Sequence, residues 1–525
     1  MTPILWSIAG TDSGGGAGLA ADQRAADAFG VHLCPVVSAI TAQNTVAVTQ
    51  VQAVAPDLLD AQLEALAADL PPRVIKTGLL GSAANARAVA RWVDRLRERG
   101  PVQLVIDPVL RASTGAAFAS DELLQVYRDE LLPRASVITP NQHEAAALLG
   151  ADTANNVPGL AGALQRLGAQ AVVVTGGDAG TPGLSLDWLQ TPHARGWLSL
   201  PRVSTSNHHG TGCTFATSLA AALALGFVAA DAAVLAKMAT THALRHARAV
   251  GQGAGPVIAR PGFGNDPTLL PRLSLDDSTP ASWPERLRGR EPGVYAIVES
   301  AERVEAVLRA QPTVSTIQLR MKRPAGVADA TWAALLGEAI QRSQRAAHAA
   351  SATLVINDHW QLALQAGARA LHLGQEDLLA LTPEDRTQLQ AARAQGVMLG
   401  LSSHSLWEIC RAAALMPDLI ACGPVWPTTT KDMPWLPQGR DNLAWWAHMA
   451  PAPVVGIGGI LEPEQLQAVA AAGAAGGCVV RGLGDEPALT LPAWLSAWQA
   501  GLARQDRTAI PALPHATLPA DGATR

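Results

Sequence analysis

The sequence predicts two α/β domains in one chain: a doubly wound domain with a mostly parallel sheet, followed by a (β/α)8 TIM barrel. Short apolar runs alternate with helical patterns in both halves, which is typical of parallel sheets with helical crossovers. The second half holds eight such runs over roughly 210 residues, the length of a small barrel. A stretch rich in proline and glycine separates the halves.

We expect four segments along the chain: a first domain at 1–260, a linker at 261–292, the barrel at 293–503, and a tail at 504–525. The linker reads Arg-Pro-Gly-Phe-Gly-Asn-Asp-Pro and continues in short polar runs without periodicity, which indicates a domain boundary. Trp283 is expected to tether it to a domain surface. The tail is rich in proline and alanine and is expected to fray.

Bulk composition narrows the class of protein. A hydrophobic content of 48% and a charged content of 16% fit a compact globular chain. A formal net charge of −5 disfavours a nucleic-acid or anionic-membrane surface. The 5 cysteines are scattered, with no C-x-x-C pair, and no signal peptide or long apolar span is apparent. These features predict a cytoplasmic protein with reduced thiols.

The first domain opens with an apolar strand at 4–9, the loop Gly10-Thr-Asp-Ser-Gly-Gly-Gly-Ala-Gly18, and a helix at about 19–29. A dinucleotide site is considered because Gly16, Gly18 and Ala21 match a relaxed G-x-G-x-x-G/A pattern. No acidic residue follows between Asp27 and Asp57, where the ribose-binding acid belongs, so that interpretation fails. No P-loop motif occurs either.

Polar motifs follow several of the later strands of this domain. Strands are predicted at 34–40, 74–75, 104–106, 137–138 and 171–174, with helices at 58–70, 83–99, 121–131 and 160–167. Ligands of such sheets bind at the carboxyl ends of the strands, so the loops after them are expected to converge on one crevice.

The segment Asn207-His-His-Gly-Thr-Gly-Cys213 precedes an apolar helical run that extends to Leu225. Glycines allow close backbone approach, and the first turn of a helix leaves N–H groups without intrahelical partners. Together they predict an anion pocket suited to a transferring phosphoryl group. Cys213 lies in the first turn, where the helix dipole favours a thiolate. These residues alone are equally compatible with an ordinary glycine-rich turn before a core helix, in which Cys213 is a small buried hydrophobic residue.

The motifs of the first half, taken in order, resemble the hydroxymethylpyrimidine/phosphomethylpyrimidine kinases, which have the ribokinase-like three-layer fold. The resemblance covers about 1–260 and rests on Ala9 to Gly18, Ala42-Gln-Asn-Thr45, Lys76-Thr-Gly78, Asp107-Pro-Val109, Thr139-Pro-Asn141, Glu144 and His209-Gly-Thr-Gly-Cys213. It implies two ATP-dependent phosphorylations of 4-amino-5-hydroxymethyl-2-methylpyrimidine.

The same resemblance implies roles for individual residues. Gln43 binds the aminopyrimidine edge, with Gly10 and Asp22 walling the pocket, although a solvated helix-face charge is an equal alternative for Asp22. Asn141 and Glu144 position Mg²⁺ on the ATP phosphates. The backbone of Gly210, Thr211 and Gly212 stabilises the transferring phosphoryl group, and Cys213 takes the substrate proton. Thr175 stands where the family often has lysine, which removes one cation near the phosphates.

In the second half, strands are predicted at 294–298, 316–319, 353–356, 370–373, 398–401, 419–421, 454–457 and 477–480. Polar motifs follow six of these strands and are expected to face one mouth of the barrel. Arg320 and Lys322 alternate along one strand end, so both are expected to point into the mouth of the barrel. Asp358 and Asp377 offer carboxylates for Mg²⁺, which suggests metal-assisted recognition of a diphosphate. An internal ion pair between Arg320 and Asp358 is the alternative.

These motifs resemble thiamine phosphate synthase over about 293–500: Gln-Leu-Arg-Met-Lys, Asn-Asp, His-Leu-Gly-Gln-Glu-Asp and Gly-Pro-Val-Trp-Pro-Thr-Thr-Thr-Lys stand in family order. The resemblance implies that the pyrimidine diphosphate is joined to 4-methyl-5-(2-phosphoethyl)thiazole with release of pyrophosphate. It assigns the pyrimidine diphosphate to Gln318, Leu319, Arg320, Met321, Lys322 and Asn357, and Mg²⁺ to Asp358 and Asp377. It assigns pyrophosphate to Ser402 and Lys431, and the thiazole phosphate to Thr428, Thr430, Gly459 and Val480, with Thr429 as a further substrate-binding residue. Arg481 replaces the usual serine, and it either strengthens or blocks the grip on the thiazole phosphate.

The sequence therefore predicts a bifunctional thiamine-biosynthesis enzyme that uses Mg²⁺ in both domains and ATP as co-substrate. Its expected partners are small molecules, namely hydroxymethylpyrimidine and its phosphates, ATP and thiazole phosphate, without nucleic acid or membrane. A homo-oligomer stays open. Two other functions are weighed: a barrel that only binds or senses thiamine phosphate, and a first domain that phosphorylates pyridoxal or a sugar.

Overall fold

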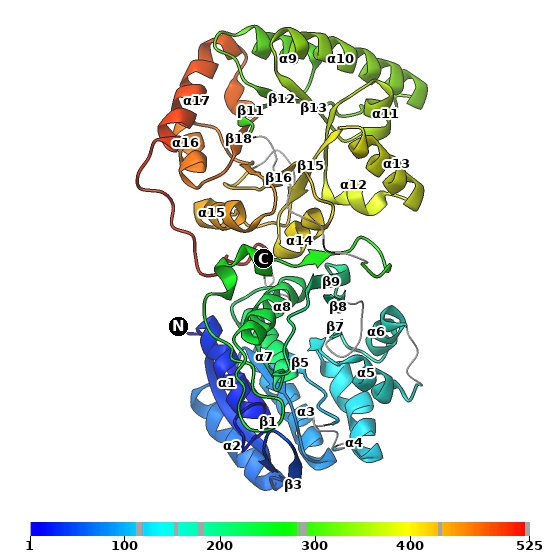
Figure 1. Cartoon of the computed structure of the whole chain (residues 1–525), viewed down its shortest axis with the longest axis vertical. Coiled ribbons are helices and arrows are strands. Elements are labelled where there is room, and N and C mark those ends of the chain that lie inside the picture. Colours follow the sequence, from blue (N-terminus) through cyan, green and yellow to red (C-terminus); the bar gives the residue numbers. More distant parts are fainter. Residues whose placement is uncertain are drawn as a thin grey trace. The chain divides into compact units, whose positions relative to one another are not determined.

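The computed structural model describes residues 2–111, 118, 120–151, 156–176, 183–280, 283, 291–428 and 433–519. The chain folds as two compact units, Met1–Trp283 with Leu518–Arg525, and Pro284–Thr517 (Figure 1). Each unit has its own sheet, and each is described in turn.

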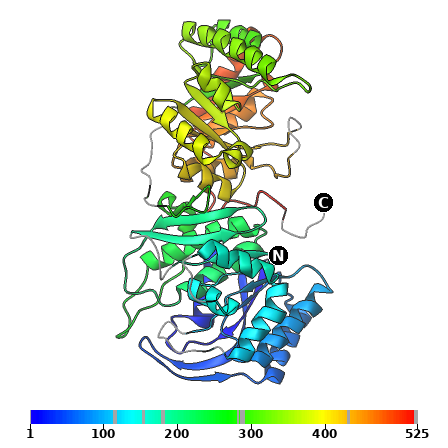
Figure 2. The same cartoon turned by 90° about the vertical axis from the view of Figure 1, so that its right-hand side faces the viewer.

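In the described part of the first unit, one sheet has the strand order β10-β9-β8-β7-β6-β5-β4-β1-β2-β3. The strands are β1 (Ile4–Gly10), β2 (His32–Gln43), β3 (Val48–Ala53), β4 (Val74–Thr77), β5 (Gln103–Ile106), β6 (Val137–Ile138), β7 (Ala171–Val174), β8 (Leu184–Gln190), β9 (Arg195–Pro201) and β10 (Arg272–Leu273). The strands β2, β1, β4, β5, β6 and β7, in their order across the sheet, pair in parallel. At one edge β3 pairs antiparallel with β2, and at the other β8, β9 and β10 continue the sheet from β7 in antiparallel pairs. The long pair β8 and β9 is teal in Figure 2. The order reverses between β1 and β4, which places the topological switch point there.

Helices cover both faces of this sheet, as the doubly wound prediction requires. One group is α1 (Gly18–Phe29), α7 (Thr211–Ala224) and α8 (Ala229–Arg245), which pack on one another. The other is α2 (Pro56–Asp69), α3 (Ala83–Arg97), α4 (Asp121–Val126), α5 (Gln142–Leu149) and α6 (Val157–Arg166). Short π- and 3-10 turns occur at Tyr127–Leu131, Leu132–Arg134, Phe263–Asn265 and Pro267–Leu269. The predicted three-layer fold is confirmed.

Alternation along β1 explains how its two faces differ. Trp6 and Ile8 are fully buried in the hydrophobic core that also holds residues of α2 to α6. Because successive side chains of a strand point to opposite faces, Ser7 faces the other layer, where it bonds to Asp22 of α1. Lys76 of β4 pairs in register with Ser7 and lies on the same face. A polar cluster therefore forms under the helices α1 and α7.

Several elements of this unit were absent from the sequence prediction. β3 has a largely exposed, polar sequence, and α5 and α8 lack a clear amphipathic stripe. The expected linker also holds structure: β10 pairs with β9, and the buried Phe263 ring lies 4.7 Å from that of Phe29. The Arg272 guanidinium lies 4.9 Å from the centre of the Trp283 ring, in line with the expected tether.

The second unit is a closed parallel barrel with the strand order β11 to β18, ringed by helices (Figure 1). The strands are β11 (Gly293–Val298), β12 (Thr316–Leu319), β13 (Thr353–Asn357), β14 (Ala370–Leu373), β15 (Met398–Ser403), β16 (Leu419–Cys422), β17 (Val454–Gly456) and β18 (Gly476–Val479). The helices are α9 (Ala301–Arg309), α10 (Asp329–Ala349), α11 (Trp360–Gln365), α12 (Gln375–Ala380), α13 (Pro383–Ala394), α14 (Leu406–Ala414), α15 (Gly439–Met449), α16 (Pro463–Ala471) and α17 (Pro487–Leu502), with a 3-10 turn at Arg481–Leu483. The predicted TIM barrel is confirmed. No helix within the described ranges of either unit is long and apolar enough to cross a membrane.

The segment after α17 differs from the frayed tail that the sequence predicted. The Asn442 amide donates to the carbonyl of His515 and accepts the His515 N–H, at 3.1 and 2.8 Å. Leu436 N–H donates to the Thr517 carbonyl at 2.8 Å, and Thr517 is buried. These bonds fasten the segment to the loop before α15 and to α15 itself. Composition did not predict them, because the partners lie more than seventy residues away along the chain.

Candidate active sites

A cavity of about 820 Å³ lies at the switch point of the first sheet, and we call it the sheet cavity. Its wall is built from the loops after β1, β4, β5 and β6 and from the start of α7. The predicted residues that line it are Gly10, Gln43, Asn141, Glu144, Gly210, Thr211, Gly212 and Cys213. The sequence-based expectation that these loops converge on one crevice agrees with this geometry.

Two glycine segments touch at the rim of the sheet cavity. A Cβ atom on Gly16 would lie 2.3 Å from Cδ2 of His209, and one on Gly210 would lie 2.2 Å from the Gly16 carbonyl oxygen. Gly210 also has φ of 84°, which favours glycine. The loop after β1 and the loop before α7 therefore pack backbone against backbone, which brings the start of α7 to the ends of the strands.

Asp22 does not wall the cavity as predicted. It is fully buried, and it is not among the described residues that line the sheet cavity. Its oxygens lie 3.1 Å from Lys76 Nζ and accept hydrogen bonds from Ser7 at 2.6 Å and Thr217 at 2.7 Å. The alternative of a solvated charge is also wrong, because the Asp22 carboxylate is fully buried and is bonded to Lys76, Ser7 and Thr217. Asp22 holds Lys76, and Lys76 lines the cavity.

Lys76, Asp107 and Cys213 make the floor of the cavity polar. Burial alone would lower the pKa of Lys76, but Asp22, together with Cys213 and Asp107 in their ionised forms, raises it above its ordinary value. Burial raises the pKa of Asp107 to about 6, against the opposing effect of Lys76, whose Nζ lies 3.6 Å from Oδ2. Lys76 and Asp107 belong to two motifs of the family resemblance, but the sequence predicted no role for either residue. A lysine inside the apolar run Val-Ile-Lys-Thr was the available signal of a buried, paired charge.

The predicted Cys213 thiolate is not what this environment favours. Burial raises the pKa of Cys213 to about 12, with Asp107 and Asp22 adding to the rise and Lys76 and the Gly18 N–H opposing it. The dipole of α7 is therefore outweighed by desolvation. Cys213 is therefore a neutral thiol in the lining of the cavity.

Asn141 and Glu144 combine two roles. The Asn141 side chain accepts from the Glu144 N–H, and the Glu144 carboxylate accepts from the Asn141 N–H, each at 2.9 Å. This reciprocal pair is a capping box at the start of α5. The N-x-x-E pattern thus has a local structural cause, while both side chains also line the cavity.

Thr175, the departure from the family pattern, lines the sheet cavity at the end of β7. The next residue, Gly176, donates its N–H to Asp187 at 2.9 Å, and Asp187 is paired with the buried Lys237 at 2.8 Å. The backbone after β7 is therefore held by an ion pair from β8 and α8.

A second cavity of about 300 Å³ opens at the carboxyl ends of the barrel strands, and we call it the barrel cavity. The predicted residues that line it are Gln318, Arg320, Asn357, Asp358, Asp377, Ser402, Thr428, Gly459, Val480 and Arg481. Arg320 and Asp358 both face this space, which is the position expected of catalytic groups in a TIM barrel.

Other predicted residues lie elsewhere. Leu319 is buried in the barrel wall, where strand alternation turns it away from Gln318 and the interior. Met321 is partly exposed and Lys322 exposed, and neither lines the cavity in the described structure. The expectation for Lys322 fails because β12 ends at Leu319, so strand alternation does not extend to it. Thr429, Thr430 and Lys431 lie outside the described residues.

The interior of the barrel holds polar residues that sequence reasoning did not assign. His372 Nε2 lies 3.0 Å from Ser402 Oγ, and burial lowers the pKa of His372 to about 4. Gln318 donates to the Tyr295 hydroxyl at 3.2 Å. Both His372 and Tyr295 line the cavity. The histidine of the motif His-Leu-Gly-Gln-Glu-Asp is thus a neutral, buried partner of Ser402.

Asp358 and Asp377 fit a metal that arrives with its substrate. Within the described ranges, no group of three or more His, Cys, Asp or Glu residues is arranged to hold a metal ion. Mg²⁺ commonly takes one or two carboxylates together with water and substrate phosphate oxygens. The two aspartates border the same cavity as Arg320, and the Gly374 N–H fixes Asp377 Oδ2 at 2.8 Å. The donor set therefore suits a Mg²⁺–diphosphate complex.

The two units match two protein-family models. The model described as phosphomethylpyrimidine kinase matches residues 12–258, and the one described as thiamine monophosphate synthase matches residues 294–483. A probable thiamine biosynthetic bifunctional enzyme of Oryza sativa is 31% identical over 479 residues, which cover 87% of this chain and 81% of that protein. The chain belongs to this family of bifunctional enzymes.

Its first unit is a hydroxymethylpyrimidine and phosphomethylpyrimidine kinase, a class that uses ATP, and its second is a thiamine phosphate synthase. A hydroxymethylpyrimidine/phosphomethylpyrimidine kinase of Synechococcus elongatus is 42% identical over 257 residues, covering 49% of this chain and 96% of that protein. Among solved structures, a Bacillus subtilis pyridoxal kinase is 30% identical, covering 49% of this chain and 98% of its own, with a TM-score of 0.45.

The raised pKa of Asp107 leads to a prediction about stability. The pKa is 3.8 ordinarily and about 6 in the fold, so the folded protein binds this proton more tightly than the unfolded chain. The charged carboxylate therefore destabilises the fold progressively between pH 4 and 6, and fully above pH 6. We expect Asp107→Asn to stabilise the first unit by roughly 3 kcal/mol at pH 8 and by little at pH 4, measured by calorimetry. An increase in stability that is the same at pH 4 and pH 8 would contradict the raised pKa of Asp107.

The thiol state of Cys213 can be measured directly. Cys213 is partly exposed, while Cys34, Cys410, Cys422 and Cys478 are buried. With a pKa of about 12, little thiolate is present at pH 8, so we expect iodoacetamide to alkylate Cys213 at least about tenfold more slowly than free cysteine. Peptide mass spectrometry over time gives the rate. Alkylation as fast as that of free cysteine would show a lowered pKa instead.

Proposed function

We propose that the sheet cavity performs both pyrimidine phosphorylations, with the transferring phosphoryl group at the start of α7. The observation that carries this proposal is the convergence of Gln43, Lys76 and Cys213 on one cavity with the segment Gly210 to Gly212 at the start of α7. Free N–H groups in the first turn of a helix stabilise the negative charge of a phosphoryl group. The buried ammonium of Lys76 adds fixed positive charge beneath it.

In this proposal, the positive charge near the phosphoryl group and the positioning of the two reactants account for most of the rate of phosphoryl transfer. In a loose phosphoryl-transfer transition state the attacking hydroxyl has lost little of its proton, so a strong base is not needed early. Cys213 takes that proton as a thiolate, after its own thiol proton has passed to water; Lys76 favours the thiolate and Asp107 opposes it. Asn141 and Glu144 border the same cavity and supply oxygens that suit Mg²⁺ on the phosphates of ATP.

We propose that the barrel cavity couples the pyrimidine diphosphate to the thiazole phosphate. Arg320 lies on its wall and offsets the negative charge of the leaving pyrophosphate. Asp358 and Asp377 lie on the same wall and would hold Mg²⁺, which would supply further positive charge there. The aminopyrimidine ring stabilises positive charge on its methylene carbon, so expulsion of the charged leaving group is the difficult step. Gly459 and Arg481, on the loops after the last two strands, suit the phosphate of the thiazole. Placement in the cytoplasm stays a prediction from the scattered cysteines.

The proposal predicts that the two activities separate by mutation. The full chain is incubated with hydroxymethylpyrimidine, thiazole phosphate, ATP and Mg²⁺, and the pyrimidine phosphates and thiamine phosphate are quantified by chromatography. Cys213→Ala is expected to reduce pyrimidine diphosphate formation by about 10²-fold or more, as loss of a proton acceptor does. Asp358→Ala is expected to leave the diphosphate to accumulate and to suppress coupling.

Two controls sharpen this experiment. Pyrimidine diphosphate added to Cys213→Ala should restore thiamine phosphate, because the barrel is intact. Pyridoxal offered in place of the pyrimidine should be phosphorylated far more slowly. A chain that binds thiamine phosphate yet makes none from the two supplied substrates would overturn the barrel assignment, and a preference for pyridoxal would overturn that of the sheet cavity.

A further inference from the structure

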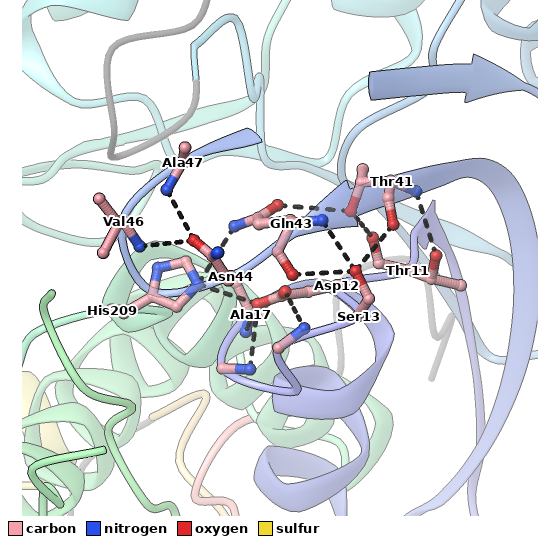
Figure 3. Close-up of polar contacts among 12 residues, drawn as sticks. Thr11, Asp12, Ser13, Ala17, Thr41, Gln43, Asn44, Val46, Ala47 and His209 are labelled. Atoms are coloured by element: carbon pink, nitrogen blue, oxygen red, sulfur yellow. Dashed lines mark hydrogen bonds and ion pairs between the residues drawn. The ribbon is translucent and has the colours of Figure 1, made fainter. Parts of the chain in front are cut away.

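The side-chain amide of Gln43 lies between two polar groups on the wall of the sheet cavity (Figure 3). Its nitrogen is 3.3 Å from Nε2 of His209, and its oxygen is 3.4 Å from Oγ1 of Thr41. The two ends of an amide have nearly the same shape, so their identity is assigned from the hydrogen-bond partners. Both partners of Gln43 are themselves engaged, and their bonds decide the assignment.

At the His209 end, the decisive contact is with Asp12. His209 Nε2 lies 2.9 Å from Asp12 Oδ2, and both side chains are buried. Burial raises the pKa of Asp12, but bonds from His209 and from the N–H groups of Ala17 and Gly14 outweigh it and lower the pKa overall. An ionised carboxylate only accepts hydrogen bonds, so His209 Nε2 carries a hydrogen. A ring N–H cannot accept from an amide N–H, and the group that faces His209 must be an acceptor.

At the other end, the decisive contact is with Thr11. The hydroxyl of Thr41 donates its single hydrogen to the Thr11 carbonyl at 2.8 Å, much closer than the 3.4 Å to the Gln43 amide. Towards Gln43, Thr41 Oγ1 therefore offers lone pairs. The group that faces Thr41 must be a donor, which is the amide NH₂.

The two ends give the same answer independently. We propose that the Asp12–His209 pair and Thr41 are positioning residues that lock the Gln43 amide, with its oxygen towards His209 and its nitrogen towards Thr41. Exchanging the two amide atoms removes both mismatches while the side chain stays in place. The amide NH₂ then donates to Thr41 Oγ1, and the amide oxygen shares the His209 Nε2 hydrogen with Asp12. One N–H and one lone pair then remain for a ligand, in a fixed order.

This inference rests on the proposed function, because it specifies how the sheet cavity reads the edge of its pyrimidine. An aminopyrimidine edge presents a ring nitrogen that accepts and an amino group that donates. A 4-oxo ring presents the reverse, a ring N–H and a carbonyl. A freely turning amide would adapt to either ligand, whereas a locked amide accepts one and leaves buried polar groups unpaired with the other.

The lock predicts discrimination that depends on the Thr41 hydroxyl. We compare kcat/KM for the 4-amino substrate and its 4-oxo counterpart in the full chain, in Thr41→Val, and in Thr41→Ser as the matched control. The unsubstituted chain is expected to prefer the amino compound by about 100-fold or more. Thr41→Val should reduce that ratio at least tenfold, in part by improving use of the oxo compound, while Thr41→Ser keeps it. An equal loss for both compounds in Thr41→Val, or equal behaviour of both variants, would overturn the lock.

A second measurement tests the lock without catalysis. In perdeuterated protein with ¹⁵N-glutamine, protonated threonine methyl groups and protonated histidine rings, the Gln43 amide signals are identified by their loss in Gln43→Met. The lock predicts nuclear Overhauser contacts from these amide protons to the Thr41 methyl group. Contacts to the His209 ring protons alone would overturn it. If the chain phosphorylates neither pyrimidine while the Thr41 contacts are present, the proposed function fails and the lock stands.

Discussion

The buried ion pair between Asp22 and Lys76 joins four elements at the switch point of the first sheet. Asp22 belongs to α1 and Lys76 to β4, and Ser7 of β1 and Thr217 of α7 complete the shell of the carboxylate. All four side chains are buried, so each bond is made in a medium that screens charge poorly. The position of α7, with its phosphoryl-binding first turn, depends on this cluster.

The cluster also sets the charge of the cavity floor. Lys76 is held by Asp22 and approached by Asp107, and it is the cation that opposes the rise in the pKa of Cys213. At the rim, the glycine loop after β1 is folded by Asp12, which accepts N–H groups from Gly14, Gly16 and Ala17. Asp12 and Asp22, which flank Gly18 in the sequence, thus have different roles: Asp12 folds the loop at the rim of the cavity, and Asp22 holds Lys76 in its floor. The barrel relies instead on aspartates and an arginine at its strand ends.

The sequence predicts those features of the fold and of the sites that depend on neighbouring residues, and it misses most of those that depend on contacts between distant residues. Each barrel strand was located because eight short apolar runs recur with polar residues after them, and Arg320, Asp358 and Ser402 do line one cavity. The partner of Lys76 was not predictable, since Asp22 lies 54 positions away and its helix position looks like a surface charge. The pKa of Cys213 was expected to fall because the helix start is visible in sequence, whereas the burial that raises it is not. The bonds of His515 were missed for the same reason. The antiparallel pair β8 and β9 was also missed, although its two strands are neighbours in the sequence.

The most direct test of this account is a double-mutant cycle on Asp22 and Lys76. Asp22→Asn, which leaves Lys76 without its main partner, is expected to destabilise the first unit by roughly 3–5 kcal/mol in urea. The double variant Asp22→Asn with Lys76→Met should be clearly more stable than the sum of the single effects, while kinase activity stays lost and coupling of supplied pyrimidine diphosphate is unchanged. Additivity within about 0.5 kcal/mol, or an active kinase in the double variant, would contradict the central role of this pair.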